Sequence, residues 1–161
     1  MNIRKTTKSD YDQVWNIFTA VIKTGDTYMF LPNTTRSEME ILWFADYITT
    51  FVVEEKGQIL GTYIIKDNQI GLGNHIANCS YMVSPKAQGR GIGKKLCEHS
   101  IQFSKDSGYM GIQFNAVVSS NKGAIALWKK YGFEIIGITP KGFRHASLGL
   151  MDTYIMFKSL D

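Results

Sequence analysis

Three glycines at alternate positions are the residues most able to do chemistry here: Gly89, Gly91 and Gly93, followed directly by Lys94. Glycine has no Cβ, so such a turn lets the backbone approach a ligand closely and adopt a positive φ. An apolar helical pattern follows the turn. The first N–H groups of a helix lack partners within the helix and lie at the positive end of its dipole. The pattern therefore predicts a phosphate or pyrophosphate site in the backbone of this turn.

The spacing excludes the two best-known phosphate-binding loops. A P-loop needs a glycine where this chain has Gln88 and a serine or threonine where it has Lys95. The dinucleotide fingerprint needs a different glycine spacing and an acidic residue about 20 residues further on. Basic side chains surround the turn, at Lys86, Arg90, Lys94 and Lys95. A polyanionic ligand would explain this cluster, and a solvated helix start is the alternative.

Three motifs in order resemble those of the GCN5-related N-acetyltransferase (GNAT) family. Gln88-x-x-Gly91-x-Gly93 resembles its coenzyme A loop, and Asn121-x-x-Ala124-x-x-Leu127-Trp128-x-x-x-Gly132-Phe133 resembles its fourth helix and following strand. Residues 151–158 resemble its last strand. The similarity covers residues 1–158, and on these motifs the chain is identified as a member of the family.

The resemblance implies the fold and the acetyl donor. The fold is α/β (α+β), with a central mixed seven-stranded sheet flanked by four helices, as one acetyltransferase domain over residues 1–161. The sheet is splayed between strands 78–83 and 111–117, and acetyl-CoA is the donor. The implied contacts to coenzyme A are mostly main-chain groups. They involve Tyr81, Met82, Val83, Gln88, Gly89, Arg90, Gly91, Ile92, Gly93, Lys94, Asn121 and Trp128.

A narrower resemblance concerns the acceptor. Residues 25–28, 68–69, 113–118 and 142–145 resemble a bacterial and fungal branch that includes yeast enzymes acetylating proline analogues such as azetidine-2-carboxylate. The branch implies a small amino-acid-like amine as acceptor, with Asn78 binding its carboxylate. The implied substrate-binding residues are Asp26, Tyr28, Asn78 and His145. The alternatives are another small amine, such as a phosphinothricin-like herbicide or an antibiotic, and a relative that binds acyl-CoA and regulates without turnover.

Two asparagines and one tyrosine are the candidate catalytic residues. Asparagine is disfavoured inside strands, so Asn115 in an otherwise apolar run needs a reason. It either bridges the splayed backbone edges or, with Asn121, orients the thioester carbonyl or a water; Asn121 also reads as an N-cap. Many family members have a tyrosine seven residues after this asparagine, which protonates the leaving thiolate, but this chain has Trp128. Either Tyr131 is the acid, or water protonates the thiolate.

The general base is open among three loop residues: His75, His145 and Asp26. Histidine side chains titrate near neutral pH, which suits proton abstraction. Zinc-type spacings such as H-E-x-x-H and C-x-x-C do not occur, so no metal site is expected. The two cysteines, Cys79 and Cys97, make a poor disulfide framework; Cys79 is interpreted as a small core residue of a strand and Cys97 as a helix residue.

Periodicity and turn residues predict the elements that position this site. Strands are expected at 2–6, 51–55, 59–66, 78–83, 111–118, 133–138 and 153–158, and helices from 11, 37, 94 and 121. Ser9 or Asp10 is expected to cap the first helix. Ile41 is expected inward on the second helix, and residues 139–149 are expected to form a long loop. A helix crossing between 78–83 and 111–118 requires those strands to be parallel.

Composition favours a globular enzyme over a nucleic-acid-binding protein. Of the 161 residues, 44% are hydrophobic and 20% charged, and the net charge is +4. Nucleic-acid binding requires a clustered basic face, whereas the basic residues here are scattered. The chain has no apolar run of the ~18 residues that cross a membrane and no apolar leader. We therefore expect a cytoplasmic enzyme with a small-molecule amine substrate, no nucleic-acid or membrane partner, and a homodimer by family habit.

Overall fold

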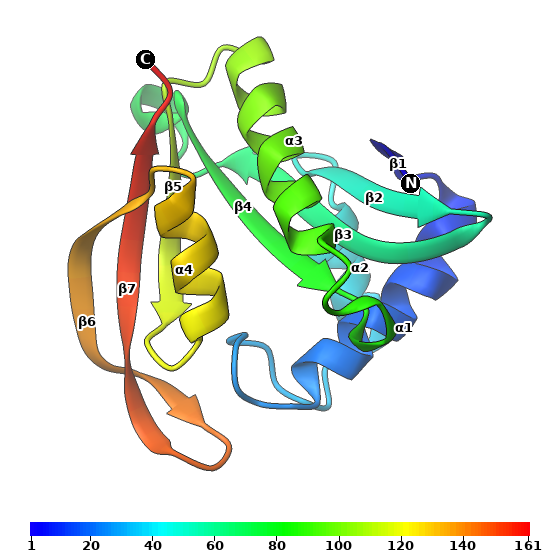
Figure 1. Ribbon diagram of the computed structural model, residues 1–161, viewed down its shortest axis with the longest axis horizontal. Helices are drawn as coiled ribbons and strands as arrows, with labels where there is room; N and C mark the ends of the chain where they lie inside the picture. The colour runs from blue at the N-terminus through cyan, green and yellow to red at the C-terminus, as the bar shows by residue number, and fades with distance from the viewer.

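The computed structural model describes residues 1–161 and contains one seven-stranded sheet with four α-helices (Figure 1). In chain order the elements are β1 (Asn2–Lys5), α1 (Tyr11–Ile22), α2 (Arg36–Phe44), β2 (Thr49–Glu55), β3 (Gln58–Asp67), β4 (Ile76–Val83), α3 (Ile92–Asp106), β5 (Gly111–Val118), α4 (Lys122–Lys130), β6 (Glu134–His145) and β7 (Gly149–Ser159). Short 3-10 turns lie at Lys8–Asp10, Gly71–Gly73 and Pro85–Ala87. No helix is long and apolar enough to span a membrane.

The strand order is β1-β2-β3-β4-β5-β7-β6, and every neighbouring pair is antiparallel except β4 and β5. The parallel pairing follows from the α3 crossover, as the sequence predicted. Only two registered pairs join these strands, Ile76 with Gly111 and Ala77 with Ile112. Beyond them β4 and β5 diverge, so the predicted splay is confirmed and opens toward the carboxyl ends of both strands (Figure 1).

The helices cover the two faces of the sheet unequally. On one face, α3 and α4 pack over a core cluster that includes Tyr63, Leu96 and Phe114. On the other face, α1 and α2 pack over a cluster that includes Phe18, Trp43 and Met82. Figure 1 shows α3 and α4 in front of the sheet and α1 and α2 behind its β2–β4 half. The face of β5–β7 opposite α4 has no helix, so α1 and α2 support the β2–β4 side of the splay and not β5.

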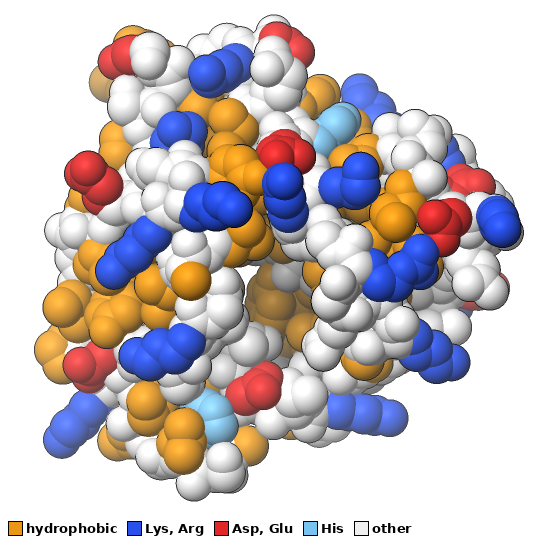
Figure 2. Space-filling model, viewed as in Figure 1, with side chains coloured by type: hydrophobic (Ala, Val, Ile, Leu, Met, Phe, Trp, Pro, Cys, Tyr) orange, Lys and Arg blue, Asp and Glu red, His pale blue; other side chains and the backbone are white.

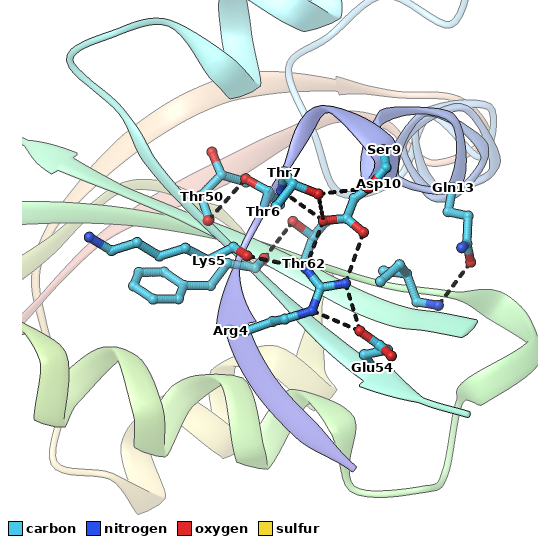
Figure 3. A network of polar contacts seen from close by, with 12 residues as sticks. Arg4, Lys5, Thr6, Thr7, Ser9, Asp10, Gln13, Thr50, Glu54 and Thr62 are labelled. Atoms are coloured by element: carbon cyan, nitrogen blue, oxygen red, sulfur yellow. Dashed lines mark hydrogen bonds and ion pairs between the residues drawn. The ribbon is translucent and has the colours of Figure 1, made fainter. Parts of the chain in front are cut away.

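A polar network fixes the start of α1 against β1 and β2 (Figure 3). The Arg4 guanidinium donates to both Asp10 carboxylate oxygens at 2.8 and 2.9 Å and to Glu54 at 2.7 Å. Asp10 also accepts from the Thr7 N–H at 2.8 Å. Asp10 occupies the N-cap position of α1, one of the two positions predicted, but its side chain makes no capping hydrogen bond to α1 and reaches back to Thr7 instead. These hydrogen bonds lower the pKa of Asp10, chiefly through the one from Arg4.

Two further expectations are corrected. Ile41 was expected to face inward on the second helix, but it is 66% exposed, and Met39 and Trp43 are the buried residues of α2. Residues 139–149 were expected to be a loop, but β6 runs to His145 and pairs with β7 around an irregularity between Thr139 and Phe143. The Pro, Gly and Lys residues that suggested a loop lie in that irregularity, because a bulge tolerates them where a regular ladder does not.

Candidate functional site

A cleft of about 520 Å³ lies where β4 and β5 diverge. Twenty residues line it, fourteen of them hydrophobic, and they come from the end of α1 and the segment after it, β4, the turn before α3, β5 and α4 with its N-cap. Figure 2 shows the molecule hollowed at its centre, with hydrophobic side chains inside the hollow and Lys and Arg side chains on the surface around it. Of the residues predicted from the sequence, the cleft brings together Tyr28, Asn78, Tyr81, Met82, Val83, Gln88, Asn115, Asn121 and Trp128.

Asn78 lies at the apex of the cleft, where the main-chain pairing of β4 and β5 ends. Its Nδ2 donates to the Gln113 carbonyl at 2.9 Å. The side chain thus takes the place of the next main-chain hydrogen bond between the two strands. The sequence had suggested an amide bridge for Asn115, and Asn78 makes it instead. One N–H of Asn78 is therefore committed to holding the strands at the point where they part.

Tyr28 partners the main chain of Tyr81 on the cleft side of β4. The Ser84 N–H donates to the Leu60 carbonyl, and the Asn68 N–H donates to the Ile76 carbonyl, so the main-chain groups of even-numbered β4 residues face β3. Because these groups alternate in direction along a strand, those of Tyr81 face away from β3. The Tyr28 hydroxyl accepts from the Tyr81 N–H at 2.9 Å and donates to the Tyr81 carbonyl. Coenzyme A was expected to contact the main chain of Tyr81, Met82 and Val83, but in this structure the Tyr81 groups are bonded to Tyr28. Burial raises the pKa of Tyr28, so the phenol stays protonated at neutral pH.

Asn115 lies at a β-bulge, which explains an asparagine within an apolar strand. The register of β5 against β7 passes from Phe114 to Val117 across an irregularity, so Asn115 and the next residue leave the ladder. The exposed Asn115 side chain donates to Asn68 Oδ1 at 2.8 Å and accepts from Gln113 Nε2 at 3.1 Å. The bulge therefore places Asn115 in the lining of a mostly apolar cleft, with its amide bonded to two residues outside that lining.

Asn121 at the N-cap of α4 and Trp128 near the end of that helix both line the cleft. Asn121 Oδ1 accepts from the Ala124 N–H at 3.4 Å, so the predicted N-cap is present. Trp128 is 8% exposed and packs against the rings of Tyr81 and Phe114, with centroids 4.8 and 4.9 Å away. Its indole N–H has no hydrogen-bond partner in the protein. Every fully buried polar side-chain atom has a partner, so this N–H is not fully buried. The indole N–H is therefore open to a ligand or to water.

Tyr131, the candidate acid, points elsewhere. Its hydroxyl donates to Glu98 Oε1 on α3 at 2.6 Å, and it is not among the residues that line the cleft. The hydrogen bond to Glu98 raises the pKa of Tyr131 to about 12. A phenol held by a carboxylate is a poor proton donor to a distant thiolate, so the geometry disfavours Tyr131 as the acid.

The glycine-rich turn leads from Gln88 at the cleft to the N-terminus of α3. Gly89 and Gly91 have φ of 77° and 74°, and a Cβ on either would meet no atom within 4 Å. Gly93 instead lies inside the first turn of α3. Along this turn, a row of backbone N–H groups has no hydrogen-bond partner in the protein: Gln88, Gly89, Gly91, Ile92, Gly93 and Lys94. Open space beside unpartnered donors at a helix start fits the diphosphate of coenzyme A.

The charged side chains near this turn are partly engaged. Arg90 donates to Glu55 at 2.5 Å, and Lys94 lies 3.8 Å from Glu98. The hydrogen bond from Arg90 lowers the pKa of Glu55. Both pairs are on the surface, where ion pairs are weak and exchange readily for a phosphate.

Three other candidates lie outside the cleft lining. Asp26 accepts from the Thr24 hydroxyl in the loop after α1. His145 Nδ1 accepts from the N–H groups of Ser147 and Leu148, each at 3.1 Å, so it caps the turn between β6 and β7. His75 lines a separate surface pocket near the start of β4. The structure therefore brings none of the three candidate bases into contact with the asparagines.

The hairpin of β6 and β7 contacts the loop after α1 across the open end of the cleft between β4 and β5. The Ala146 N–H donates to the Gly25 carbonyl at 2.9 Å, and a Cβ on Gly25 would lie 2.9 Å from the Ala146 Cβ. We call this the Gly25–Ala146 contact. This contact could not be predicted from the sequence, because Gly25 and Ala146 are far apart in the chain and Ala146 lies on the other half of the sheet.

Comparison with known proteins agrees with this architecture. A profile of the acetyltransferase (GNAT) family matches residues 15–133. N-acetyltransferase aca1 of Schizosaccharomyces pombe is 30% identical over 83% of this chain and 72% of its own length. Peptidyl-lysine N-acetyltransferase YjaB of Salmonella typhimurium is 27% identical over 85% and 86%. A GCN5-related N-acetyltransferase from Kribbella flavida superposes with a TM-score of 0.92 at 33% identity, covering 98% of this chain and 96% of that one.

The parted parallel strands, the donor-rich turn before α3 and the family match over most of the chain point the same way. This chain belongs to the GNAT family of N-acetyltransferases, whose acetyl donor is acetyl-CoA.

Proposed function

We propose that this enzyme acetylates the amine of a small, amino-acid-sized acceptor bound in the cleft between β4 and β5, and that residues 1–161 act as one domain. The observation that carries the proposal is the cleft itself. About 520 Å³ suits a small molecule. The Gly25–Ala146 contact across the open end hinders the entry of a folded chain.

The donor side uses mostly main-chain groups. The unpartnered N–H groups from Gln88 to Lys94 would hold the diphosphate, and the main chain of Val83 would bind the pantetheine arm, since Tyr81 is already partnered. When bound, acetyl-CoA supplies an activated thioester carbonyl. Asn115 and Asn121 present amides that orient the reacting groups, and the free indole N–H of Trp128 offers a further hydrogen bond.

No side-chain acid is needed in this proposal. Trp128 stands where many relatives have tyrosine, and an indole N–H has no useful acidity. The Tyr131 hydroxyl is held by Glu98. A thiolate whose conjugate thiol has a pKa of ~8.5 is a tolerable leaving group at neutral pH, so water can protonate it.

The relatives leave the acceptor open. YjaB is named as a peptidyl-lysine N-acetyltransferase, and a protein lysine is therefore the second candidate acceptor. A small acceptor, such as a proline analogue, agrees better with the enclosed cleft. Release of thiol from acetyl-CoA, measured over a panel of small amines and a lysine peptide, tests the choice. Faster turnover of the peptide than of every small amine would refute the small-acceptor proposal.

Self-association is proposed through β6, the edge strand of the sheet. Its outer residues Ile136 and Ile138 are each 57% exposed, and Leu148 and Leu150 on the same hairpin are 60% and 55% exposed. Sedimentation equilibrium should show a dimer that Ile138→Lys weakens. A monomer at concentrations of tens of micromolar would contradict it.

A further inference from the structure

The cleft is lined by twenty residues, and none of them is Asp, Glu, Lys, Arg or His. Three lining residues can titrate: Tyr28, Cys79 and Tyr81. Tyr81 is bonded through its hydroxyl to Ser100 Oγ at 2.8 Å, and Cys79 is buried in the strand. Burial raises the pKa of all three, so they are neutral at physiological pH. The acceptor therefore meets amides, hydroxyls, one thiol, aromatic rings and aliphatic side chains, but no formal charge.

Charged groups on the neighbouring elements stay outside the lining. On the loop after α1, Asp26 accepts from the Thr24 hydroxyl, and on α4, Lys122 follows Asn121; neither lines the cleft. Strands β4 and β5 carry no charged residue. The outer half of the β6–β7 hairpin carries Lys141, Arg144, His145 and Asp152, and the Asp152 carboxylate accepts from the Lys141 N–H at 2.9 Å. The glycine turn carries Lys86, Arg90, Lys94 and Lys95, and none of these eight residues lines the cleft.

A cleft without charged side chains disfavours the binding of an amino acid whose amine is an ammonium cation or whose acid group is a carboxylate. An ammonium group or a carboxylate taken from water into this cleft would have no counter-ion, which is costly. The amine must also carry a lone pair to attack the thioester. With no side-chain base in the cleft, it loses its proton to bulk water first. At pH 7 an amine of pKa 10.4 is neutral in about 0.04% of molecules, and one of pKa 7.7 in about 17%.

We propose that the acceptor enters as a neutral, weakly basic amine without a carboxylate, for example an amino-acid amide or ester. This inference rests on the proposed function and narrows its substrate class. The chemistry balances without an enzyme acid or base. The amine nitrogen forms a bond to the acetyl carbon while the C–S bond breaks, and the proton that the nitrogen sheds is equivalent to the one that the thiolate takes up. The enzyme then needs no acidic tyrosine at the position that Trp128 occupies.

The test compares azetidine-2-carboxylate with azetidine-2-carboxamide, and proline with prolinamide, by thiol release from pH 6 to 10. We expect kcat/KM at pH 7 to be about tenfold or more higher for each amide. The amide should remain the better substrate after correction for the neutral fraction of each amine, because the carboxylate penalty persists. Each amide profile should rise with unit slope and level off at the pKa of that amine.

Two outcomes would overturn the inference. One is a preference for the carboxylates. The other is a break at one fixed pH for every amine, displaced in Asp26→Asn, because that would identify a base on the enzyme. In both cases acetyl transfer still occurs, so the proposed function would stand. If no small amine led to thiol release from acetyl-CoA, the proposed function itself would be refuted.

Discussion

Replacing Tyr28 by Phe removes one hydroxyl that serves two main-chain groups. The hydroxyl accepts from the Tyr81 N–H at 2.9 Å and donates to the Tyr81 carbonyl. An orphaned polar group costs about 1–3 kcal/mol when it is fully buried. Both Tyr81 groups face the cleft, where water can enter, so the cost for the pair should stay near the range for a single group. We expect the free energy of unfolding to fall by about 1–3 kcal/mol.

Urea unfolding without acetyl-CoA measures this loss, with an unchanged m-value as evidence that only stability changed. For a domain of this size each kcal/mol lowers Tm by about 2–4 °C, so the Tm should fall by roughly 2–12 °C. Tyr47→Phe is the matched control, because Tyr47 is 69% exposed and its hydroxyl has no partner in the protein. Its effect should stay within about 0.5 kcal/mol. Equal stability of the two variants would refute the hydroxyl bridge between the loop and β4.

Three other predictions concern the helix start, the donor turn and the asparagines. The lowered pKa of Asp10 contributes stability that is full above its unfolded pKa of ~4 and is lost as pH falls through the folded value. Urea unfolding of wild type and Asp10→Asn should therefore differ by about 1–3 kcal/mol at pH 7, and this gap should shrink steadily as the pH falls below ~4; a constant gap would exclude the Arg4 pair as the cause. Gly91→Ala and Gly57→Ala impose similar strain, at φ of 74° and 79°, and should each cost about 1 kcal/mol of stability, but only Gly91→Ala should raise the KM for acetyl-CoA, by about tenfold. Equal KM values would place the diphosphate elsewhere. Asn115→Ala and Asn121→Ala should each lower kcat about tenfold and Tyr131→Phe less than about twofold; the reverse ranking in steady-state kinetics would restore Tyr131 as the acid.

The sheet and its splay could be predicted because their signals are local or tied to family motifs. The apolar alternation of the strands and the Gln88–Gly93 pattern can each be recognised within a short segment, and the α3 crossover requires parallel strands on either side of it. The family match and the parallel pairing of β4 with β5 confirm the fold that these signals predicted. The extent of β6 could not be read, because Pro140, Lys141 and Gly142 are ordinary loop residues. Only pairing with β7, through the Asp152 carboxylate on the Lys141 N–H at 2.9 Å, shows them to be a bulge.

Site chemistry was harder to predict than the fold, since it depends on contacts between distant segments. Asn115 and Asn78 are both asparagines in apolar strands, and nothing local distinguishes the one that bridges β4 and β5 from the one at a bulge. Tyr28 was expected to touch the acceptor, but its bond to the Tyr81 main chain depends on how the loop after α1 folds back over β4. The hydrogen bond from the Leu148 N–H to the His145 ring could likewise not be predicted from the sequence.

The Gly25–Ala146 contact has a consequence for how fast the pocket can exchange its contents. It is the only hydrogen bond between the loop after α1 and the β6–β7 hairpin. A main-chain hydrogen bond is worth about 1 kcal/mol net, so thermal breathing would leave this one broken in roughly one molecule in six. Loops move within nanoseconds to microseconds, whereas a typical enzyme turns over about 10 times per second. The mouth would thus open many thousands of times during each catalytic cycle, and an acetylated product could depart without waiting for any larger rearrangement of the sheet.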